Sequence, residues 1–471
     1  MTQPIVRVAV LAERRLTEMA LPTELPLREI LPAVQRLAVP SAVGDSSTDD
    51  EVGTLLSLAP IGGAPFSLDA SLDTVGVVDG DLLALQPVPK GPPAPGIVED
   101  IADAAVIFSA ARRTPWGASH IQRGALAATI AAALAGTGLG ATYRAVTGEL
   151  SGLFTVGAIA LLTAVAALVT TLGNAPRSTR AAFALSVAAL APIGAGLALM
   201  VPGAFGPAQA MLAAAGVTAW SVIVLMLPGA ERERRAAVFT ATAVVGAALT
   251  LAAAAATLWT FALATIGAAV IAAALLITIA AAPLSALAAR LPLPVIPAPG
   301  DPAPPAPSLR VLEDLPRRVR VGDAHQSGFI AAAVLLTVLG SVAIALRPEA
   351  VAGAGWYVVA ATSVASILRA RVWDSAVCKG WLLAQPFLVA VVLVVIYAAT
   401  GRYDAALVAV LVLAVLAFGW LVVALNPGIA APESYSLPVR RLLGFAAAGL
   451  DASLIPVMAY LSGLFSWVLD R

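Results

Sequence analysis

The residues of this chain that could do chemistry are few and widely spaced. Asp451 is the one ionisable residue well inside a long apolar stretch, whereas a proton or cation carrier needs several such groups at mid-membrane depth. Two histidines, His120 and His325, lie far apart, and Cys378 is the one cysteine. A disulfide or a cysteine-based metal site therefore cannot form within the chain, and we expect no cofactor.

Catalytic and nucleotide-binding motifs are missing as well. The sequence contains no G-x-x-x-x-G-K-[ST], no H-E-x-x-H and no G-x-S-x-G, the patterns of phosphate loops, zinc proteases and serine hydrolases. We therefore expect a protein that is not an enzyme and that depends on another chain for energy. Asp451 alone makes a poor relay. It is either functional, at a water-filled cavity or a partner helix, or structural, paired with another group or lying near the interface.

Composition indicates a membrane protein. The 471 residues are 60% hydrophobic and 12% charged, with a mean hydropathy of +0.92, whereas soluble domains are roughly 45–50% apolar and about 25% charged. A soluble globular enzyme is thereby excluded. The 28 basic and 28 acidic residues cancel, so the net charge predicts no nucleic-acid partner.

Residues 1–86 have the charge density of a small soluble head. Alternating apolar residues in 5–12 and a returning stretch at 16–21 predict a β-hairpin. Further strands are expected at 54–59 and at 82–85, the last after an Asp-Gly-Asp turn.

Between the hairpin and these strands, apolar residues recur at helical spacing: Leu27, Ile30, Leu31, Val34 and Leu37. Pro32 inside this pattern predicts a kinked helix or one that begins late. The order of elements is the β-grasp order of ubiquitin. Because the head has no diglycine tail and no nucleophile, we expect it to bind a partner, with a simple folding cap as the alternative.

Residues 87–123 read as a linker and a juxtamembrane helix. Five prolines between Pro87 and Pro95 predict a semi-rigid spacer. Apolar residues at helical spacing from Val98 to Phe108, followed by Arg112 and Arg113, predict an interfacial helix, with an extension of the first span as the alternative.

Eleven apolar stretches are long enough to cross a bilayer. They are 124–142, 153–172, 181–201, 208–227, 236–256, 259–282, 329–346, 355–368, 380–399, 405–425 and 442–467. The eighth is the shortest. The fifth and sixth are separated only by Thr257 and Leu258, so ten spans with one re-entrant stretch is the competing count.

The distribution of Lys and Arg predicts the orientation. With the head in the cytoplasm and eleven spans, 18 cations fall on the cytoplasmic side and 4 on the other, and 6 in the head and linker complete the 28. We therefore expect a multi-pass protein of the inner membrane, with a cytoplasmic N-terminus and an extracytoplasmic C-terminus.

One long loop, residues 289–328, is expected on the cytoplasmic side between spans 124–288 and spans 329–471. It opens with eight prolines and ends in a basic stretch at 309–321 that contains Arg317, Arg318 and Arg320. A stiff spacer with a basic segment suits docking on a partner or on anionic lipid. The alternative is a plain connector between two groups of helices.

The order of these parts resembles EccD, the polytopic membrane subunit of actinobacterial type VII (ESX) secretion systems. The resemblance covers essentially the whole chain and depends on the combination: a head ending in Val77-Val78-Asp79-Gly80-Asp81-Leu82-Leu83-Ala84-Leu85, a proline linker, a helix with Trp116, and eleven spans rich in Ala, Val and Leu. Among the paralogues, the chain looks most like the subunit of the metal-acquisition system.

The resemblance implies an inner-membrane complex with EccB, EccE and EccC, the last being an FtsK/SpoIIIE-like ATPase. It also implies a second EccD copy, in dimers whose helices enclose a lipid-filled space. Two functions compete: a non-enzymatic scaffold of a secretion machine, and a secondary transporter of an apolar or lipid-like substrate with a regulatory head. Asp451, Arg317, Arg318 and Arg320 are the candidate structural or partner contacts.

Overall fold

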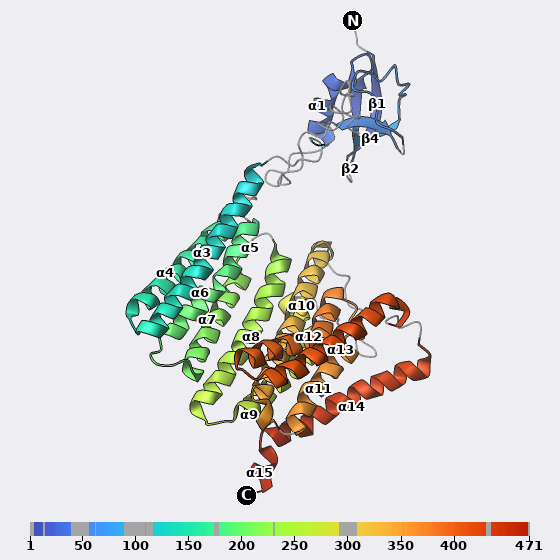
Figure 1. The fold of residues 1–471 in the computed structure, drawn as a ribbon. Helices are drawn as coiled ribbons and strands as arrows, with labels where there is room; N and C mark the ends of the chain where they lie inside the picture. The colour runs from blue at the N-terminus through green and yellow to red at the C-terminus, as the bar shows by residue number, and fades with distance from the viewer. Residues whose placement is uncertain are drawn as a thin grey trace, which may run out of the picture. The chain divides into compact units, whose positions relative to one another are not determined.

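The structure is a computed structural model that describes residues 4–12, 15–38, 56–61, 63–88, 109, 116–173, 179–228, 231–291, 309–351, 353–429 and 435–469. The chain forms two compact units, Met1–Ile121 and Gln122–Arg471, a small mixed head and a larger helical unit (Figure 1). The expected interfacial helix at 98–113 lies outside the described residues except for Ser109.

The head contains a four-stranded mixed sheet with the order β2-β1-β4-β3. Strands β1 (Ile5–Ala12) and β2 (Arg15–Pro22) form the predicted antiparallel hairpin, in register from Ile5 opposite Pro22 to Ala12 opposite Arg15. Strand β4 (Leu82–Pro87) runs parallel to β1 and pairs with β3 (Leu56–Pro60) on its other side. The ubiquitin-like head is thereby confirmed.

Helix α1 (Leu27–Ala38) packs its apolar side on one face of this sheet. The helix begins at Leu27 and continues through Pro32, so the expected late start is wrong. Packing explains this, because Leu27, Leu31 and Val34 are all buried against the sheet, and tertiary contacts commonly outweigh local propensity. The core of the head comprises Val6, Val8, Val10, Ala12, Leu21, Leu27, Ile30, Leu31, Val34, Ala38, Leu58, Leu72 and Leu83.

The helical unit runs from α3 to α15. Its α-helices are α3 (Ala118–Thr147), α4 (Leu150–Leu172), α5 (Thr179–Ala188), α6 (Leu190–Leu199), α7 (Pro207–Met226), α8 (Arg232–Leu258), α9 (Leu263–Ala288), α10 (Leu309–Ala345), α11 (Gly353–Arg369), α12 (Ala376–Ala399), α13 (Tyr403–Leu425), α14 (Leu437–Leu461) and α15 (Leu464–Leu469), with short 3-10 helices η2 (Pro348–Ala350) and η3 (Pro427–Ile429).

Ten of the described helical stretches are long and apolar enough to be candidate membrane spans, with α5 and α6 counted as one. The difference from the expected eleven is α11, which has 17 residues. Helices α8 and α9 are separate helices with a break between Leu258 and Leu263. Each of the two is long and apolar enough to be a candidate span by itself, so the count of ten does not come from one re-entrant stretch at this position.

Although short, α11 crosses the helical unit. Tyr397, near the end of α12, donates a hydrogen bond of 2.5 Å to the carbonyl oxygen of Ala345, the last residue of α10. Helices α10 and α12 therefore end at the same side, and α11, which connects them, must run back between. At 1.5 Å per residue its 17 residues extend about 26 Å, close to the ~30 Å thickness of the hydrocarbon layer.

Two expected boundaries are wrong. Residues 309–321, expected as the end of a loop, form the first part of the 37-residue helix α10, which continues through Pro316. The last expected span, 442–467, is divided into α14 and α15 at Ser462 and Gly463. Gly463 has a φ of +70°, a left-handed conformation that commonly ends helices.

The third span is broken between α5 and α6, at Ala189. Pro192 lies in the first turn of α6 and has no backbone N–H to continue the ladder of hydrogen bonds. The indole N–H of Trp220 in α7 donates a buried hydrogen bond of 2.9 Å to the carbonyl oxygen of Ser186. A buried backbone group at the break is thus satisfied by a side chain from a neighbouring helix.

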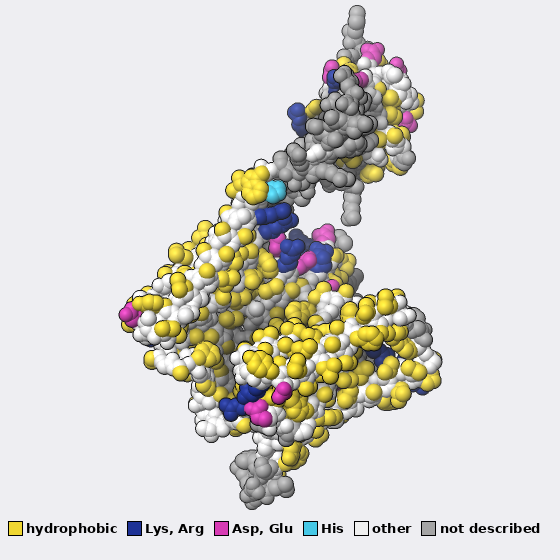
Figure 2. Space-filling view, in the orientation of Figure 1, with side chains coloured by type: hydrophobic (Ala, Val, Ile, Leu, Met, Phe, Trp, Pro, Cys, Tyr) yellow, Lys and Arg dark blue, Asp and Glu magenta, His cyan; other side chains and the backbone are white. Residues whose placement is uncertain are grey.

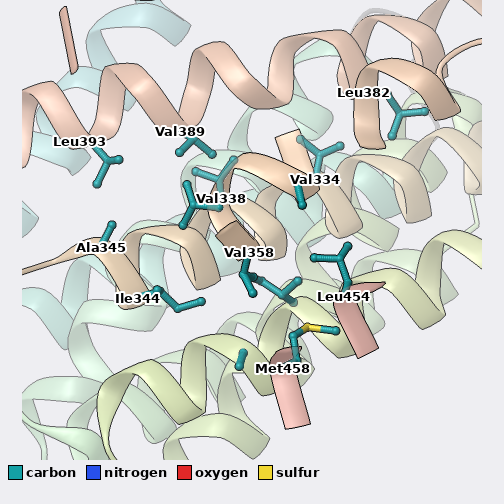
Figure 3. Packing of buried hydrophobic residues seen from close by; sticks show 14 of the residues in the cluster. Val334, Val338, Ile344, Ala345, Val358, Leu382, Val389, Leu393, Leu454 and Met458 are labelled. Carbon is teal, nitrogen blue, oxygen red and sulfur yellow. The ribbon is translucent and has the colours of Figure 1, made fainter. Parts of the chain in front are cut away.

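The largest core lies around α10 (Figure 3), where Val334 and Val338 meet Val358 of α11, Leu382 and other residues of α12, and Leu454 of α14. Helices α9 and α10 approach very closely at Gly267 and Gly340. A Cβ built on either glycine would lie 2.6 to 2.7 Å from the other's carbonyl oxygen. Small residues permit such backbone contact, as is usual between membrane helices.

Candidate assembly site of the helical unit

Asp451, the predicted isolated carboxylate, is paired with Arg369 in the structure. The Arg369 Nε atom donates a hydrogen bond of 3.1 Å to Oδ2 of Asp451, and its Nη2 atom contacts Oδ1. The side chains of Arg369 and Asp451 are 17% and 39% exposed. The two-point contact is the bidentate geometry in which a guanidinium binds a carboxylate most strongly.

The helices that carry this pair explain its position. Arg369 ends α11, where a cation interacts favourably with the negative end of the helix dipole. Asp451 is in the middle of α14, which packs on α11. A carboxylate held by a guanidinium stays charged and in place, so the arrangement can join two helices, and it offers no second group for proton transfer.

The three basic candidates Arg317, Arg318 and Arg320 are all bonded within the chain. Arg317 Nε and Arg318 Nε bind the two oxygens of Asp314, at 2.7 Å and 2.6 Å. Arg318 Nη1 also donates a hydrogen bond of 2.6 Å to the carbonyl oxygen of Arg290. Because α10 is helical here, these side chains project at the i, i+3 and i, i+4 spacing that favours such pairs.

Arg290 follows the C-terminus of α9 and has a φ of +53°. Backbone hydrogen bonds from Arg290 N to Leu287 O and from Leu291 N to Ala286 O form the Schellman motif that ends helices. Arg318 thus places its charge at the negative end of the α9 dipole. This cation fastens the first part of α10 to the end of α9.

A second set of contacts joins α10 to α8. Arg320 Nε lies 2.8 Å from Oε1 of Glu233, and Nδ1 of His325 lies 2.7 Å from Oγ1 of Thr240. Figure 2 shows basic and acidic side chains gathered where α8 and α10 begin, on a face that is otherwise mostly apolar. The hydrogen bond between His325 and Thr240 therefore helps to join α10 to α8.

An ion pair also fastens the opposite end of α10. Glu349 of η2 binds Arg402, which precedes α13, at 3.1 Å. A hydrogen bond from its own backbone lowers the pKa of Glu349, and the nearby Arg402 guanidinium lowers it further. The carboxylate therefore stays charged at neutral pH and joins two turns on the side where α10 and α12 end.

Within the described ranges there is no group of three or more His, Cys, Asp or Glu side chains that could hold a metal. Cys378 is a free, buried thiol in the first turn of α12. Sequence reasoning missed the partners Arg369, Glu233 and Asp314. For Arg369 a signal was present, because it is the basic residue at the end of the expected eighth span and a carboxylate inside a membrane helix needs a countercharge.

Two family models match the two units of the chain. The model described as WXG100 protein secretion system (Wss), protein YukD, matches residues 5–85, which form the head. The model described as EccD-like transmembrane domain matches residues 105–470.

Whole-length relatives agree with these matches. The ESX-3 secretion system protein EccD3 of Mycobacterium tuberculosis strain H37Rv is 71% identical over 469 residues, covering 99% of this chain and 98% of the relative. EccD3 of Mycolicibacterium smegmatis is 59% identical over 475 residues, covering 99% and 98%. The solved structure of protomer 1 of the ESX-3 core complex contains a chain that is 58% identical, with a TM-score of 0.69 and coverage of 98% and 100%. A head and a transmembrane domain that both match, over nearly the whole length, show that this chain belongs to the EccD family.

Proposed function

We propose that this chain is a non-enzymatic membrane subunit of an ESX-3 type VII secretion complex. The observation that carries the proposal is the 71% identity to an ESX-3 EccD3 protein over 99% of the chain. The resemblance implied the subunit of the metal-acquisition system. That system is ESX-3, and these relatives are ESX-3 proteins. The contacts of Asp451, Arg318 and Arg320 support an architectural role, because each joins two helices of the bundle.

In this role the helical unit holds the inner-membrane assembly together, and the head docks the partner ATPase, EccC. EccB, EccE and a second copy of the chain are the other proposed partners. One support for docking by the head is that the head has a hydrophobic core of its own. The other is that the sequence has no nucleotide-binding motif, so the proposed complex must take its energy from another chain.

The test is deletion in a cell that carries the secretion system. Loss of the gene should abolish export of the system's substrates. Loss of residues 1–86 alone should leave the membrane helices inserted while the ATPase no longer copurifies with them. The matched control restores the head on a linker of the same length. Copurification of the ATPase without the head would contradict the docking role.

We also propose that the N-terminus is cytoplasmic and the C-terminus extracytoplasmic. Support comes from the 18-to-4 distribution of cations. It also comes from α11, which runs back between α10 and α12: added to the ten candidate spans, it gives eleven, and an odd number of spans puts the two termini on opposite sides. Reporter fusions after Gly96 and after Arg471 should be active on opposite sides of the membrane. A C-terminal fusion active only as a cytoplasmic reporter would contradict the orientation.

The competing transporter function is tested with the purified chain alone in liposomes. A scaffold should move no solute. Movement of a solute that depends on the chain would overturn the scaffold proposal in favour of the transporter.

A further inference from the structure

Helix α14 is attached to the bundle along only its second half. Its first 13 residues, 437–449, include no buried residue, whereas Leu454 and Met458 are buried. Figure 3 shows these two side chains beside Val358 of α11, and Figure 1 shows α14 crossing the bundle obliquely. We call residues 437–449 the free half and the rest of α14 the packed half. The direction of the free half therefore depends on the contacts that α14 makes where the packed half begins.

Two polar contacts lie at that boundary, and both come from α11. Arg369 binds Asp451, as described above. The hydroxyl groups of Tyr357 and Ser453 lie 2.5 Å apart, and Ser453 Oγ also donates to the carbonyl oxygen of Leu450 at 2.7 Å. The Ser453 hydrogen is thus used, so Tyr357 is the donor in its contact with Ser453.

The spacing of the four residues gives this pair of contacts its mechanical effect. Tyr357 and Arg369 are 12 residues apart in α11, a rise of about 18 Å, while Asp451 and Ser453 are two apart, a rise of about 3 Å. Long side chains from opposite ends of α11 therefore converge on one turn of α14. A single contact would allow α14 to pivot, whereas two that arrive from opposite directions oppose both pivoting and sliding.

The surroundings make the contacts hard to exchange. The side chain of Arg369 is only 17% exposed, so another countercharge or water could replace Asp451 only poorly. A shift of α14 by one turn, about 5.4 Å, would separate both pairs at once. Among the described contacts of α14, the polar link from Thr265 Oγ1 to the carbonyl oxygen of Leu461 at 3.3 Å lies at the far end of the packed half, ten residues from Asp451.

We propose that Tyr357 and Arg369 are positioning residues that fix the crossing of α14 over α11 and so set the direction of its free half, residues 437–449. Burial of Leu454 and Met458 stabilises the packed half against the bundle, and the two polar contacts fix the angle at which α14 crosses α11. The inference concerns contacts within one chain and stands independently of the proposed function.

The test measures distances between spin labels in the full chain, in lipid nanodiscs. Cys378→Ser removes the native thiol, and labels at Phe445→Cys and Leu276→Cys report the free half of α14 against α9; both sites are exposed. A second pair, Ile455→Cys with Leu276→Cys, reports the packed half. The variants are Tyr357→Phe alone and Tyr357→Phe with Asp451→Asn. The matched control is Tyr460→Phe, another tyrosine exchange on an exposed side chain of α14.

The parent and the Tyr460→Phe control should give one narrow distance peak for each pair. Tyr357→Phe should broaden the 445–276 peak, and the double variant should broaden it further, while the 455–276 peak stays narrow. An unchanged 445–276 peak would overturn the proposal, and so would equal broadening of both peaks, since that would indicate general loosening of α14. If the double variant does not fold, the same two outcomes are decided with Tyr357→Phe alone.

Discussion

The ion pair between Arg369 and Asp451 makes a quantitative prediction about stability. Asp451→Asn keeps the shape of the side chain and leaves the guanidinium of Arg369, which is 17% exposed, without its countercharge. Removing one partner of a buried pair costs about 3–5 kcal/mol, whereas an exposed pair contributes only about 0.2–1 kcal/mol.

Two features of the site lower the expected cost below the buried range. The Asp451 side chain is 39% exposed, and Arg369 keeps its favourable place at the C-terminus of α11, which contributes about 0.3–1 kcal/mol. We therefore expect Asp451→Asn to lower the free energy of unfolding by about 2 kcal/mol. Arg369→Gln should cost a similar amount, and the double variant less than the sum, with a coupling of about 1 kcal/mol or more.

The assay is unfolding of the full chain in mixed micelles by increasing SDS, followed by the fluorescence of its 8 tryptophans. Asp374→Asn is the matched control, because Asp374 is exposed in the turn between α11 and α12. A coupling below about 0.5 kcal/mol would refute the pairing argument, as would an equal loss in the control. At the level of function, unchanged complex yield with lost secretion would contradict the assembly role of Asp451.

Three further variants test the packing of the bundle by the same unfolding assay. Gly340→Ala should destabilise by about 1–3 kcal/mol, because its Cβ would lie 2.6 Å from the carbonyl oxygen of Gly267; no loss would show that α9 and α10 can separate freely. Trp220→Phe should cost about 1–3 kcal/mol by leaving the Ser186 carbonyl without its donor, and a neutral result would refute the role of the indole at the break. Arg290→Gly should stabilise by about 1 kcal/mol, because a left-handed φ is costly for other residues; destabilisation would mean that the lost charge matters more.

The parts of the fold that could be predicted are those with local signals. The hairpin of the head follows from alternation in β1, and the spans follow from long apolar runs such as α13. Interpreting 309–321 as loop failed because prolines precede it and Pro316 lies within it. Helix α10 forms there because its arginines bind Asp314 at local i, i+3 and i, i+4 spacing and also bind Glu233 and the end of α9. The last two contacts join helices that are distant in sequence, and no local pattern contains them.

The candidate site was only half predictable for the same reason. Asp451 was recognisable as a carboxylate in an apolar helix, but its partner is 82 residues away in sequence. Arg317, Arg318 and Arg320 were recognisable as a basic group, and Asp314 lies at local spacing from the first two. The bonds of Arg318 to Arg290 and of Arg320 to Glu233 depend on how α8, α9 and α10 pack, which the sequence pattern does not contain.

The distribution of polar contacts limits how this chain can meet a partner. In the described helical unit, Arg318, Arg320, Arg369 and Arg402 are bonded within the chain, whereas α13 and the first half of α14 present exposed apolar side chains. Contacts in the membrane must then depend on shape and close packing, since lipid tails are as apolar as the helices and supply no hydrophobic force. Such contacts need helices held at fixed angles, and the internal ion pairs and hydrogen bonds of α10 and α14 provide that rigidity.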